Sequence, residues 1–339
     1  MLKIEQQVSL LHKNTLALPS FAENFCRVST ESELCEVLAW SRQHRSPVTI
    51  LGGGSNVVLA RDLGGLVVQM GISGIELISE EQDQRVVRVG AGENWHQLVL
   101  STIEQGWFGL ENLSLIPGLA GAAPIQNIGA YGVELSQRFL SLEAIHLETG
   151  EQVVMDASEC QFGYRDSVFK HSGRDQYAIT AITLALSSRK NLCLDYPALQ
   201  KALDGIDESE LTPKRVSDAV CGVRRTKLPS PEDIPNVGSF FKNPVISKEQ
   251  AERLRQQYPQ LVSYHQVDGR EKLAAGWLVE QAGWKGFKQH GVGVHHQQSL
   301  VLVNSGGTGA DLLSLASDIQ ASVADKFGIS LEIEPRVYS

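Results

Sequence analysis

The sequence predicts an α+β fold, because strands dominate and only short helices lie between them. Helix and strand do not alternate in the steady rhythm of a parallel α/β sheet. At roughly 150 residues per domain, the 339 residues suggest two domains or three small ones. Apolar runs predict strands at residues 48–51, 57–59, 65–70, 85–89, 142–147, 153–155, 177–186, 300–303 and 330–337.

Capping residues mark the predicted helices. Thr30 and Glu33 have the spacing of a capping box, and Thr308 and Asp311 repeat it. Glycines end two of these helices, since glycine tolerates the left-handed backbone that follows a last turn. The predicted helices begin after Thr30, carry Trp95 and Leu98 before a stop at Gly106, follow Ser247, cover 273–281, and run from Thr308 to Gly328.

Composition excludes several classes of protein. Hydrophobic residues make up 42% and charged residues 20%, which is typical of a soluble globular protein. The 30 basic and 39 acidic residues give a net charge of −9, so a general nucleic-acid binder is not expected. A local basic pocket for a phosphorylated small molecule stays possible.

Location follows from three further features. The first residues lack the pattern of a signal peptide. The longest uncharged stretch, 112–133, is rich in Gly, Pro, Asn and Gln, and is therefore a loop rather than a membrane span. Five cysteines without a C-x-x-C pair indicate reduced, mostly buried thiols. We expect a cytoplasmic protein with no membrane contact.

The first glycine-rich segment lies between two predicted strands and consists of Gly52, Gly53, Gly54, Ser55 and Asn56. Exposed backbone N–H groups with Ser and Asn side chains form a nest for anions. Pyrophosphate binding and a plain tight turn are equally compatible with it. No Gly-Lys-Ser/Thr follows and no G-x-G-x-x-G is present, so neither a P-loop nor a Rossmann motif applies.

The second segment, 116–132, is the strongest feature of the sequence. Its small residues allow the backbone to approach a flat ligand closely. A loop this long and irregular inside a compact domain is uncommon unless it has a function. A structural crossover is the alternative.

Together these segments resemble the family of UDP-N-acetylenolpyruvoylglucosamine reductases. The likeness covers nearly the whole chain, through residues 163–167 (GYRDS), 224–229 (RRTKLP), 238–244 (GSFFKNP), 273–278 (LAAGWL) and 332–334 (EIE). It implies an FAD-binding domain of the vanillyl-alcohol-oxidase/PCMH type, made of two α+β subdomains, and a C-terminal α+β substrate-binding domain. The boundaries we expect are 1–72 and 73–228 for the FAD subdomains, with a lid insertion near 192–217, then 229–330 for the substrate domain and 331–339 for a C-terminal strand carrying Glu334.

The resemblance also implies an activity. NADPH reduces FAD and leaves as NADP⁺, and UDP-N-acetylglucosamine enolpyruvate then enters the same cleft. Hydride passes from flavin N5, the carbanion is protonated, and UDP-N-acetylmuramate is formed for peptidoglycan synthesis, and so for cell-wall biogenesis, cell shape and cell division. Use of one pocket in turn accounts for the missing Rossmann motif. The expected partners are the UDP-sugar and NADPH, with a monomer as the expected form.

Three residues match the catalytic positions of that family. Arg165 would hold the negative charge that develops beside the substrate carboxylate, because its guanidinium is planar and permanently cationic. Ser239 would donate the proton to the carbanion, and Glu334 would contact the same carbon region. The alternatives are a structural ion pair for Arg165 and Glu334, and a cap or turn for Ser239.

Ligand-binding residues also follow from the resemblance. Tyr196 would be the lid tyrosine of the longer form of the family; a core or edge tyrosine is the alternative. Lys227 would act as a point charge for phosphate, although a surface lysine is the common case. The expected substrate-binding residues are Tyr196, Arg224, Lys227 and Asn243. The expected FAD-binding residues are Gly52, Gly53, Gly54, Ser55, Asn56, Pro117, Gly118, Gly121, Ala122, Ala123, Gln126, Asn127, Gly129, Ala130, Tyr131 and Tyr164.

No metal site is expected. His295 and His296 are adjacent, and adjacent side chains of a strand point to opposite faces. Two other functions stay open: an oxidase of the same flavin superfamily that passes electrons to O₂, and a nucleotide-sugar sensor without activity. Residues around Ser239 and Glu334 disfavour the first, and the intact catalytic set disfavours the second.

Overall fold

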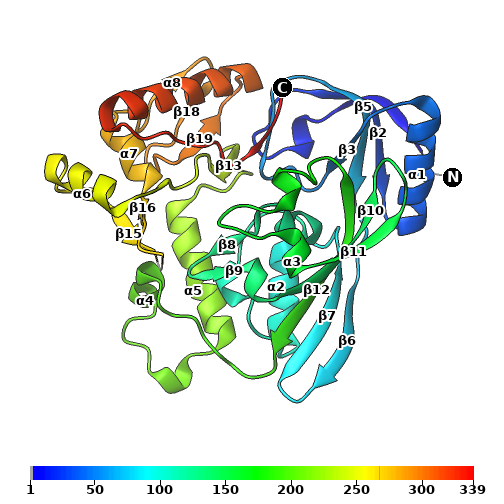
Figure 1. Cartoon of the computed structure of the whole chain (residues 1–339), viewed down its shortest axis with the longest axis horizontal. Coiled ribbons are helices and arrows are strands. Elements are labelled where there is room, and N and C mark those ends of the chain that lie inside the picture. Colours follow the sequence, from blue (N-terminus) through cyan, green and yellow to red (C-terminus); the bar gives the residue numbers. More distant parts are fainter. Residues whose placement is uncertain (1–2, 267) are drawn as a thin grey trace. The chain divides into compact units, whose positions relative to one another are not determined.

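The computed structural model describes residues 3–266 and 268–339, and the chain divides into two compact units (Figure 1). The first unit takes in residues up to 8, 22–54 and 63–226. The second takes in residues 9–21, 55–62 and 227–339. The chain therefore crosses between the units at several points, one of them between Gly54 and Ser55. The finer domain boundaries given above stay a prediction.

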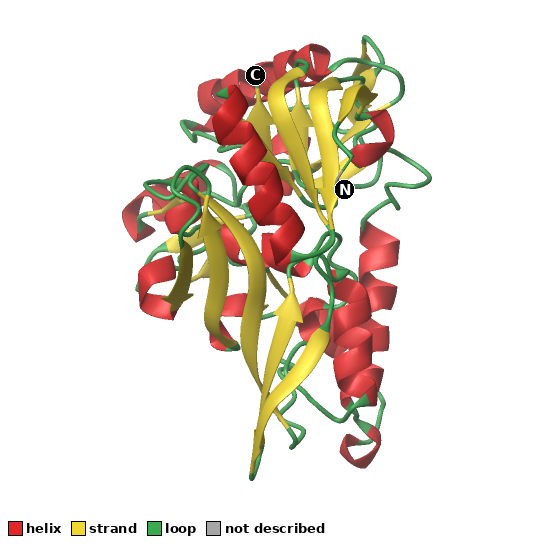
Figure 2. Ribbon diagram, turned by 90° about the vertical axis from the view of Figure 1, so that its right-hand side faces the viewer, coloured by secondary structure: helices red, strands yellow, loops and turns green. Residues whose placement is uncertain are grey.

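Two sheets form the first unit. The four-stranded sheet has the order β1-β2-β5-β3, and β5 is parallel to both β2 and β3. The five-stranded sheet has the order β11-β10-β12-β7-β6 and is antiparallel throughout. Its long strands twist along their length (Figure 2). The strands are β1 Glu5–Ser9, β2 Phe21–Val28, β3 Val48–Leu51, β5 Leu63–Met70, β6 Ile75–Glu81, β7 Gln84–Gly90, β10 Phe139–His146, β11 Gln152–Asp156 and β12 Tyr177–Ser187, with the short hairpin β8 Gly129–Ala130 and β9 Val133–Glu134.

Five helices complete the first unit, and two of them close its main core. Leu34 and Val37 of one helix, with Trp95 and Leu98 of another, are buried against residues of both sheets. The cap predicted at Thr30 is confirmed, since its hydroxyl accepts the Glu33 N–H at 3.1 Å. The helices are α1 Glu31–His44, α2 Trp95–Glu104, α3 Ala157–Cys160, α4 Pro197–Ala202 and α5 Pro213–Lys227.

The second unit has a four-stranded sheet of order β13-β19-β18-β17 and a three-stranded sheet of order β14-β16-β15. A parallel pair, β20 with β4, joins the C-terminal residues to residues 57–59. The strands are β4 Val57–Leu59, β13 Asn236–Ser239, β14 Val245–Ile246, β15 Ser263–His265, β16 Glu271–Leu273, β17 Lys288–Gln289, β18 Val292–Val294, β19 Val301–Asn304 and β20 Arg336–Tyr338. The helices are α6 Lys248–Gln257, α7 Ala275–Gln281 and α8 Gly309–Phe327.

Helix α8 follows the sequence prediction at both ends. Thr308 and Asp311 form a reciprocal capping box, and Gly328 ends the helix with φ of 65°. The predicted strand over 330–337 is wrong, however, because only Arg336–Tyr338 is a strand and Glu334 precedes it. Pro335 interrupts this segment, and a proline has no N–H with which to continue a ladder.

The segment predicted as an irregular loop, 112–133, is largely irregular, with short 3₁₀ turns and the β8–β9 hairpin. Cys26, Cys160 and Cys221 are buried, Cys193 is half-buried and Cys35 is exposed. Within the described parts of the chain, no helix is long and apolar enough to cross a bilayer.

Candidate functional site

Within the first unit, Gly52 and Gly53 of the first glycine-rich segment lie against the second segment. A Cβ built on Gly53 would lie 3.4 Å from the Cα of Gly118, and one on Gly52 would lie 3.7 Å from the Leu119 side chain. Gly53 and Ala122 are exposed, so backbone and small side chains form the surface here. Such a surface fits the close approach of a flat dinucleotide to main-chain N–H groups.

The start of helix α2 holds the second glycine segment in place. The Trp95 N–H donates to the Gly118 carbonyl at 3.0 Å, and the Gly121 N–H donates to the Ala91 carbonyl at 2.9 Å. The Trp95 indole N–H donates to the Leu113 carbonyl at 3.0 Å. The irregular backbone is therefore fixed by a regular element, as a preorganised ligand site requires.

A tight turn carries Tyr164 and Arg165. The Gly163 N–H donates to the Asp166 carbonyl at 3.0 Å, which closes the turn, and Arg165 has a left-handed φ of 52°. The Asn127 side chain donates to the Gly163 carbonyl at 3.1 Å. The Ser167 hydroxyl donates to the Ile125 carbonyl at 2.7 Å.

Asn127, one of the predicted FAD-binding residues, makes further hydrogen bonds inside the protein. Its Nδ2 also donates to Glu134 at 2.9 Å, its Oδ1 accepts the Ser136 N–H at 2.9 Å, and it is buried. The amide thus ties the predicted flavin segment to the turn that carries Arg165.

Arg165 reaches the predicted flavin segment directly. Its Nη2 donates to the Gly129 carbonyl at 2.6 Å, and its guanidinium lies 5.7 Å from the centroid of the Tyr164 ring. The two residues are 36 positions apart, so this contact could not be predicted from the sequence. The structure thus brings a predicted catalytic residue to predicted cofactor residues within one unit.

A second arginine, Arg224, lies in the same unit near the end of α5. It is half-buried, its Nε has no accessible surface, and no hydrogen-bond partner for that Nε exists among the described residues. Burial lowers the pKa of the Arg224 guanidinium, and the positive charge of Arg165 lowers it further. A buried donor without a partner, close to a second cation, suits an anionic ligand.

Tyr131 and Tyr196 meet beside this arginine. Their rings are perpendicular, with centroids 5.1 Å apart, and Tyr196 precedes helix α4. Tyr131 packs against a small separate core built from the predicted lid segment and α5. This core consists of Leu199, Leu203, Leu211, Val216 and Val220. Burial raises the pKa of the Tyr131 phenol. The predicted lid is therefore a folded element that contacts the glycine segment.

In the second unit, Ser239 and Glu334 come together although 95 residues separate their positions (334 − 239 = 95). The Glu334 N–H donates to the Phe240 carbonyl at 2.9 Å, and Phe241 bridges Ile333 in antiparallel fashion. Both side chains are half-buried. One backbone hydrogen bond thus joins Glu334 to Phe240, the residue that follows Ser239.

The remaining predicted substrate residues have clear local settings. The Asn243 Oδ1 accepts the Ala275 N–H at 2.9 Å and so caps helix α7. Lys227 is exposed at the last position of α5. Lys242, which precedes Asn243, pairs with Glu332.

The geometric argument against the histidine pair is wrong. His295 and His296 follow strand β18 in a bend, and their ring centroids are 4.5 Å apart. They do not point to opposite faces of a strand. Across residues 3–266 and 268–339, no group of three or more His, Cys, Asp or Glu side chains could hold a metal ion.

Sequence reasoning missed two buried asparagines. The Asn112 side chain donates to the carbonyls of Tyr131 and Cys193, at 2.9 and 2.8 Å, and so connects the second glycine segment to the predicted lid. Asn236 lies three residues before Ser239 and is equally buried. Their positions in the sequence could have identified them. Asn112 is the first residue of the uncharged stretch, and Asn236 begins the segment that contains Ser239.

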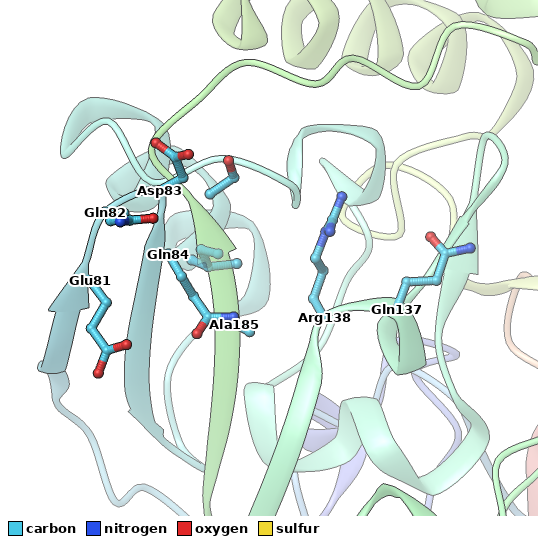
Figure 3. A pocket seen from close by; sticks show the side chains of 9 residues that line it. Glu81, Gln82, Asp83, Gln84, Gln137, Arg138 and Ala185 are labelled. Carbon is cyan, nitrogen blue, oxygen red and sulfur yellow. The ribbon is translucent and has the colours of Figure 1, made fainter.

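A pocket of about 510 Å³ lies at the end of the five-stranded sheet (Figure 3). Side chains of the β6–β7 hairpin line one side of it, and Gln137 and Arg138 line the other. None of the predicted site residues lines this pocket.

Comparisons with known proteins agree over both parts of the chain. Residues 22–156 match the model of an FAD binding domain, and residues 230–338 match that of the C-terminal domain of UDP-N-acetylenolpyruvoylglucosamine reductase. The predicted fold class, an α+β FAD-binding domain with a separate C-terminal domain, is confirmed.

Several full-length relatives carry the same name, UDP-N-acetylenolpyruvoylglucosamine reductase. The Pseudomonas putida protein is 47% identical over 98% of each chain. The Bordetella pertussis protein is 49% identical over 96% of this chain and 92% of its own. The crystal structure of the Thermus caldophilus reductase covers 100% of both chains with a TM-score of 0.70, and at 22% identity it supports the fold.

Proposed function

The chain belongs to the family of UDP-N-acetylenolpyruvoylglucosamine reductases, and on that premise we propose that it reduces UDP-N-acetylglucosamine enolpyruvate with electrons from NADPH. It is an FAD-dependent oxidoreductase of peptidoglycan-precursor synthesis. The product is UDP-N-acetylmuramate. We also propose a cytoplasmic location and a monomeric form.

The observation that carries the proposal is the hydrogen bond from the Glu334 N–H to the carbonyl of Phe240, the residue that follows Ser239. Reduction of an enolpyruvyl ether needs a hydride at the terminal carbon and a proton at the adjacent one. FAD, when bound, supplies the hydride. The chain must supply the proton, and it must stabilise the negative charge of the carbanion until that proton is transferred.

Ser239 donates that proton in our proposal. A serine hydroxyl is a weak acid, so it protonates only a strongly basic carbanion and must then recover a proton. Glu334, whose N–H bonds to the carbonyl of Phe240, would contact the same carbon region, as a neutral acid or through water. Arg165 stabilises the enolate-like charge, because a preorganised cation aimed at developing charge is usually the largest catalytic contribution.

Binding of the cofactor would use the exposed glycine surface of the first unit. The residues that would hold FAD are those of the two glycine segments and Tyr164, as given above. Their small side chains and close backbone approach fit a dinucleotide. Tyr196, Arg224, Lys227 and Asn243 would hold the UDP-sugar, and the unpartnered Nε of Arg224 supports a negatively charged ligand there.

One spectroscopic experiment tests the proposal. The purified yellow protein, without oxygen, should be bleached by NADPH and should regain its colour on addition of UDP-N-acetylglucosamine enolpyruvate. The Ser239→Ala variant should be bleached but should not regain its colour. Ser305→Ala, a change at an exposed serine of the same unit, should behave as wild type. A wild-type protein that ignores the sugar and reacts rapidly with O₂ would favour the oxidase instead.

Steady-state kinetics give a second test. Since NADPH and the sugar are proposed to use one pocket in turn, initial rates should follow a ping-pong pattern. Intersecting lines would contradict the shared pocket.

A further inference from the structure

We propose that Asn236 is a positioning residue that sets the orientation of Ser239, a role that rests on the proton donation proposed for Ser239. Asn236 lies at the start of strand β13, whose last residue is Ser239. Nothing in the reaction chemistry requires an amide there. Instead, the amide of Asn236 stabilises an irregularity in the backbone of strand β13.

Strand β13 contains a bulge between Asn236 and Ser239. Asn236 pairs with Val303 of strand β19, and Ser239 pairs with Val301. Three steps along β13 therefore match two steps along β19, so one extra residue is inserted. Gly238 supplies it, with a left-handed φ of 72°, and such a glycine is a recognised component of β-bulges.

The bulge decides on which face of the sheet Ser239 lies. Side chains alternate along a strand, and a shift of one residue moves every later side chain to the other face. Val301 and Val303 share a face, so Asn236 and Ser239 share it as well. Without the inserted residue, Gly238 would oppose Val301 and the Ser239 hydroxyl would point to the opposite face.

The Asn236 side chain closes this bulge. Its Oδ1 accepts the Gly238 N–H at 2.8 Å, and its Nδ2 donates to the carbonyls of Ile234 and Pro229 at 2.8 and 3.1 Å. The residue is 1% exposed. Its own N–H donates to the Thr15 carbonyl at 3.0 Å.

An amide is the side chain that meets all these demands. One oxygen accepts and one nitrogen donates twice, so both polar atoms are satisfied in a buried place. An alanine would leave the Gly238 N–H and two carbonyls without these partners. The bulge would then lose the contact that closes it, and the Ser239 hydroxyl would lose its fixed direction.

Asn304 offers a matched control in the same sheet. It is 3% exposed, donates to the carbonyls of Leu16 and Ala17 at 2.8 and 3.2 Å, and accepts the N–H groups of Gly306 and Gly307 at 3.1 and 2.8 Å. Its turn leads to helix α8 and not to Ser239. Loss of this amide should therefore lower stability at least as much without moving the hydroxyl.

The experiment compares Asn236→Ala with Asn304→Ala in the holoenzyme. Both should show a lower Tm and unchanged bleaching by NADPH. Reoxidation by UDP-N-acetylglucosamine enolpyruvate should be about tenfold to a hundredfold slower in Asn236→Ala, the range expected for a misplacement of about 1 Å. It should be unchanged in Asn304→Ala. Amide hydrogen exchange of the Gly238 N–H, measured without substrate, should be faster only in Asn236→Ala.

Two further variants test the acceptor and the bulge separately. Asn236→Asp keeps the acceptor for the Gly238 N–H but loses both donors, so its Tm should fall while its reoxidation rate stays near that of wild type. Gly238→Ala strains the bulge itself, although its Cβ would meet no atom within 4 Å, and should slow reoxidation. Gly269→Ala is its control, because Gly269 has φ of 82° and equally open space.

The inference would be overturned if the two variants, Asn236→Ala and Asn304→Ala, slowed bleaching and reoxidation to the same extent. Asn236 would then have a structural role only. Wild-type reoxidation in Asn236→Ala, with reoxidation lost in Ser239→Ala, would also overturn it while leaving the proposed role of Ser239 intact. Reoxidation that survives in Ser239→Ala would overturn the role of Ser239, and this inference with it.

Discussion

The guanidinium of Arg165 donates a hydrogen bond of 2.6 Å to the carbonyl oxygen of Gly129, so a predicted catalytic side chain touches the backbone of the predicted flavin segment. Arg165 also holds a left-handed φ of 52°. For a residue with a Cβ this conformation costs about 1–2 kcal/mol. The closed turn at Gly163 and the contact with Gly129 offset that cost and fix the direction of the guanidinium.

Replacing Arg165 by Lys should separate charge from geometry. A lysine keeps the positive charge but lacks the planar fork of donors. We expect the variant to bind FAD and to be bleached by NADPH, while reoxidation by the sugar slows roughly 10²-fold to 10³-fold. Stopped-flow absorbance of the flavin measures both steps. Arg174→Lys, at an exposed arginine beside Asp175, is the control; equal slowing of both steps in Arg165→Lys would contradict the assignment.

Replacing Glu334 by Gln should slow the chemical step that follows flavin reduction. The contact that places this residue, from its N–H to the Phe240 carbonyl, belongs to the backbone and survives the change. We expect a reoxidation step slowed roughly 10²-fold, the usual scale for loss of an acid or base, in stopped-flow absorbance of the flavin.

Glu332→Gln is the matched control for that variant. Glu332 lies two positions earlier, is exposed, and pairs with Lys242 at the surface. It should leave both half-reactions unchanged. A normal reoxidation rate in Glu334→Gln would remove the side chain from the proposed mechanism.

Much of the fold could be predicted from the sequence, because its signals are local. Caps at Thr30 and Thr308 and apolar runs such as 177–186 lie within one element each, and the structure confirms them. Helix α5 was missed because few of its residues are apolar. Thr212, whose hydroxyl accepts the Arg215 N–H at 3.1 Å, and Pro213 in the first turn were the available signals.

The arrangement of the site was less accessible, because its contacts cross long sequence distances. The bulge before Ser239 depends on pairing with Val301, which is far along the chain. Likewise, the contact between Arg165 and Gly129 depends on how two irregular loops meet. Motif matching could identify these residues through family resemblance, but the hydrogen bonds that orient them required the structure.

Replacing Gly121 by Ala should weaken the protein and its hold on FAD. A Cβ at this position would lie 2.4 Å from the Cβ of Ala91, closer than real carbon atoms approach. Overpacking of this kind costs typically about 1–3 kcal/mol. We expect a lower Tm for the FAD-free protein and a raised Kd for FAD, measured by thermal unfolding and by flavin fluorescence.

Gly53→Ala is the comparison for Gly121→Ala. Its Cβ would lie 3.4 Å from the Cα of Gly118, an ordinary contact, so the Tm of the FAD-free protein should be retained. Any loss of FAD affinity in this variant would then report contact with the ligand. An unchanged Tm in Gly121→Ala would show that the segment can move away from Ala91, against the rigid arrangement described above.

Acid should loosen the second glycine segment through His96. The Nδ1 of His96 accepts the N–H of Leu115 at 3.0 Å, and Leu115 has a left-handed φ of 59°. A ring nitrogen accepts only when it carries no proton. Burial, followed by the positive charges of Arg225 and Arg224, lowers the pKa of His96 below its ordinary value of 6.5. The neutral acceptor is thereby maintained at neutral pH.

The sign of the pH effect follows from proton binding. With a lowered pKa in the folded state, the unfolded chain binds the proton more readily, so stability rises with pH. The contribution of His96 is fully present above about pH 6.5 and is lost as the pH falls toward the lowered pKa of the folded state.

His96→Gln, which offers an amide oxygen as acceptor without titrating, should reduce the loss of unfolding free energy on acidification by about 1 kcal/mol. Urea unfolding on both sides of pH 6.5 measures this difference. His12→Gln, at an exposed position, should keep the wild-type pH dependence, and an equally steep dependence in His96→Gln would exclude His96 as its source.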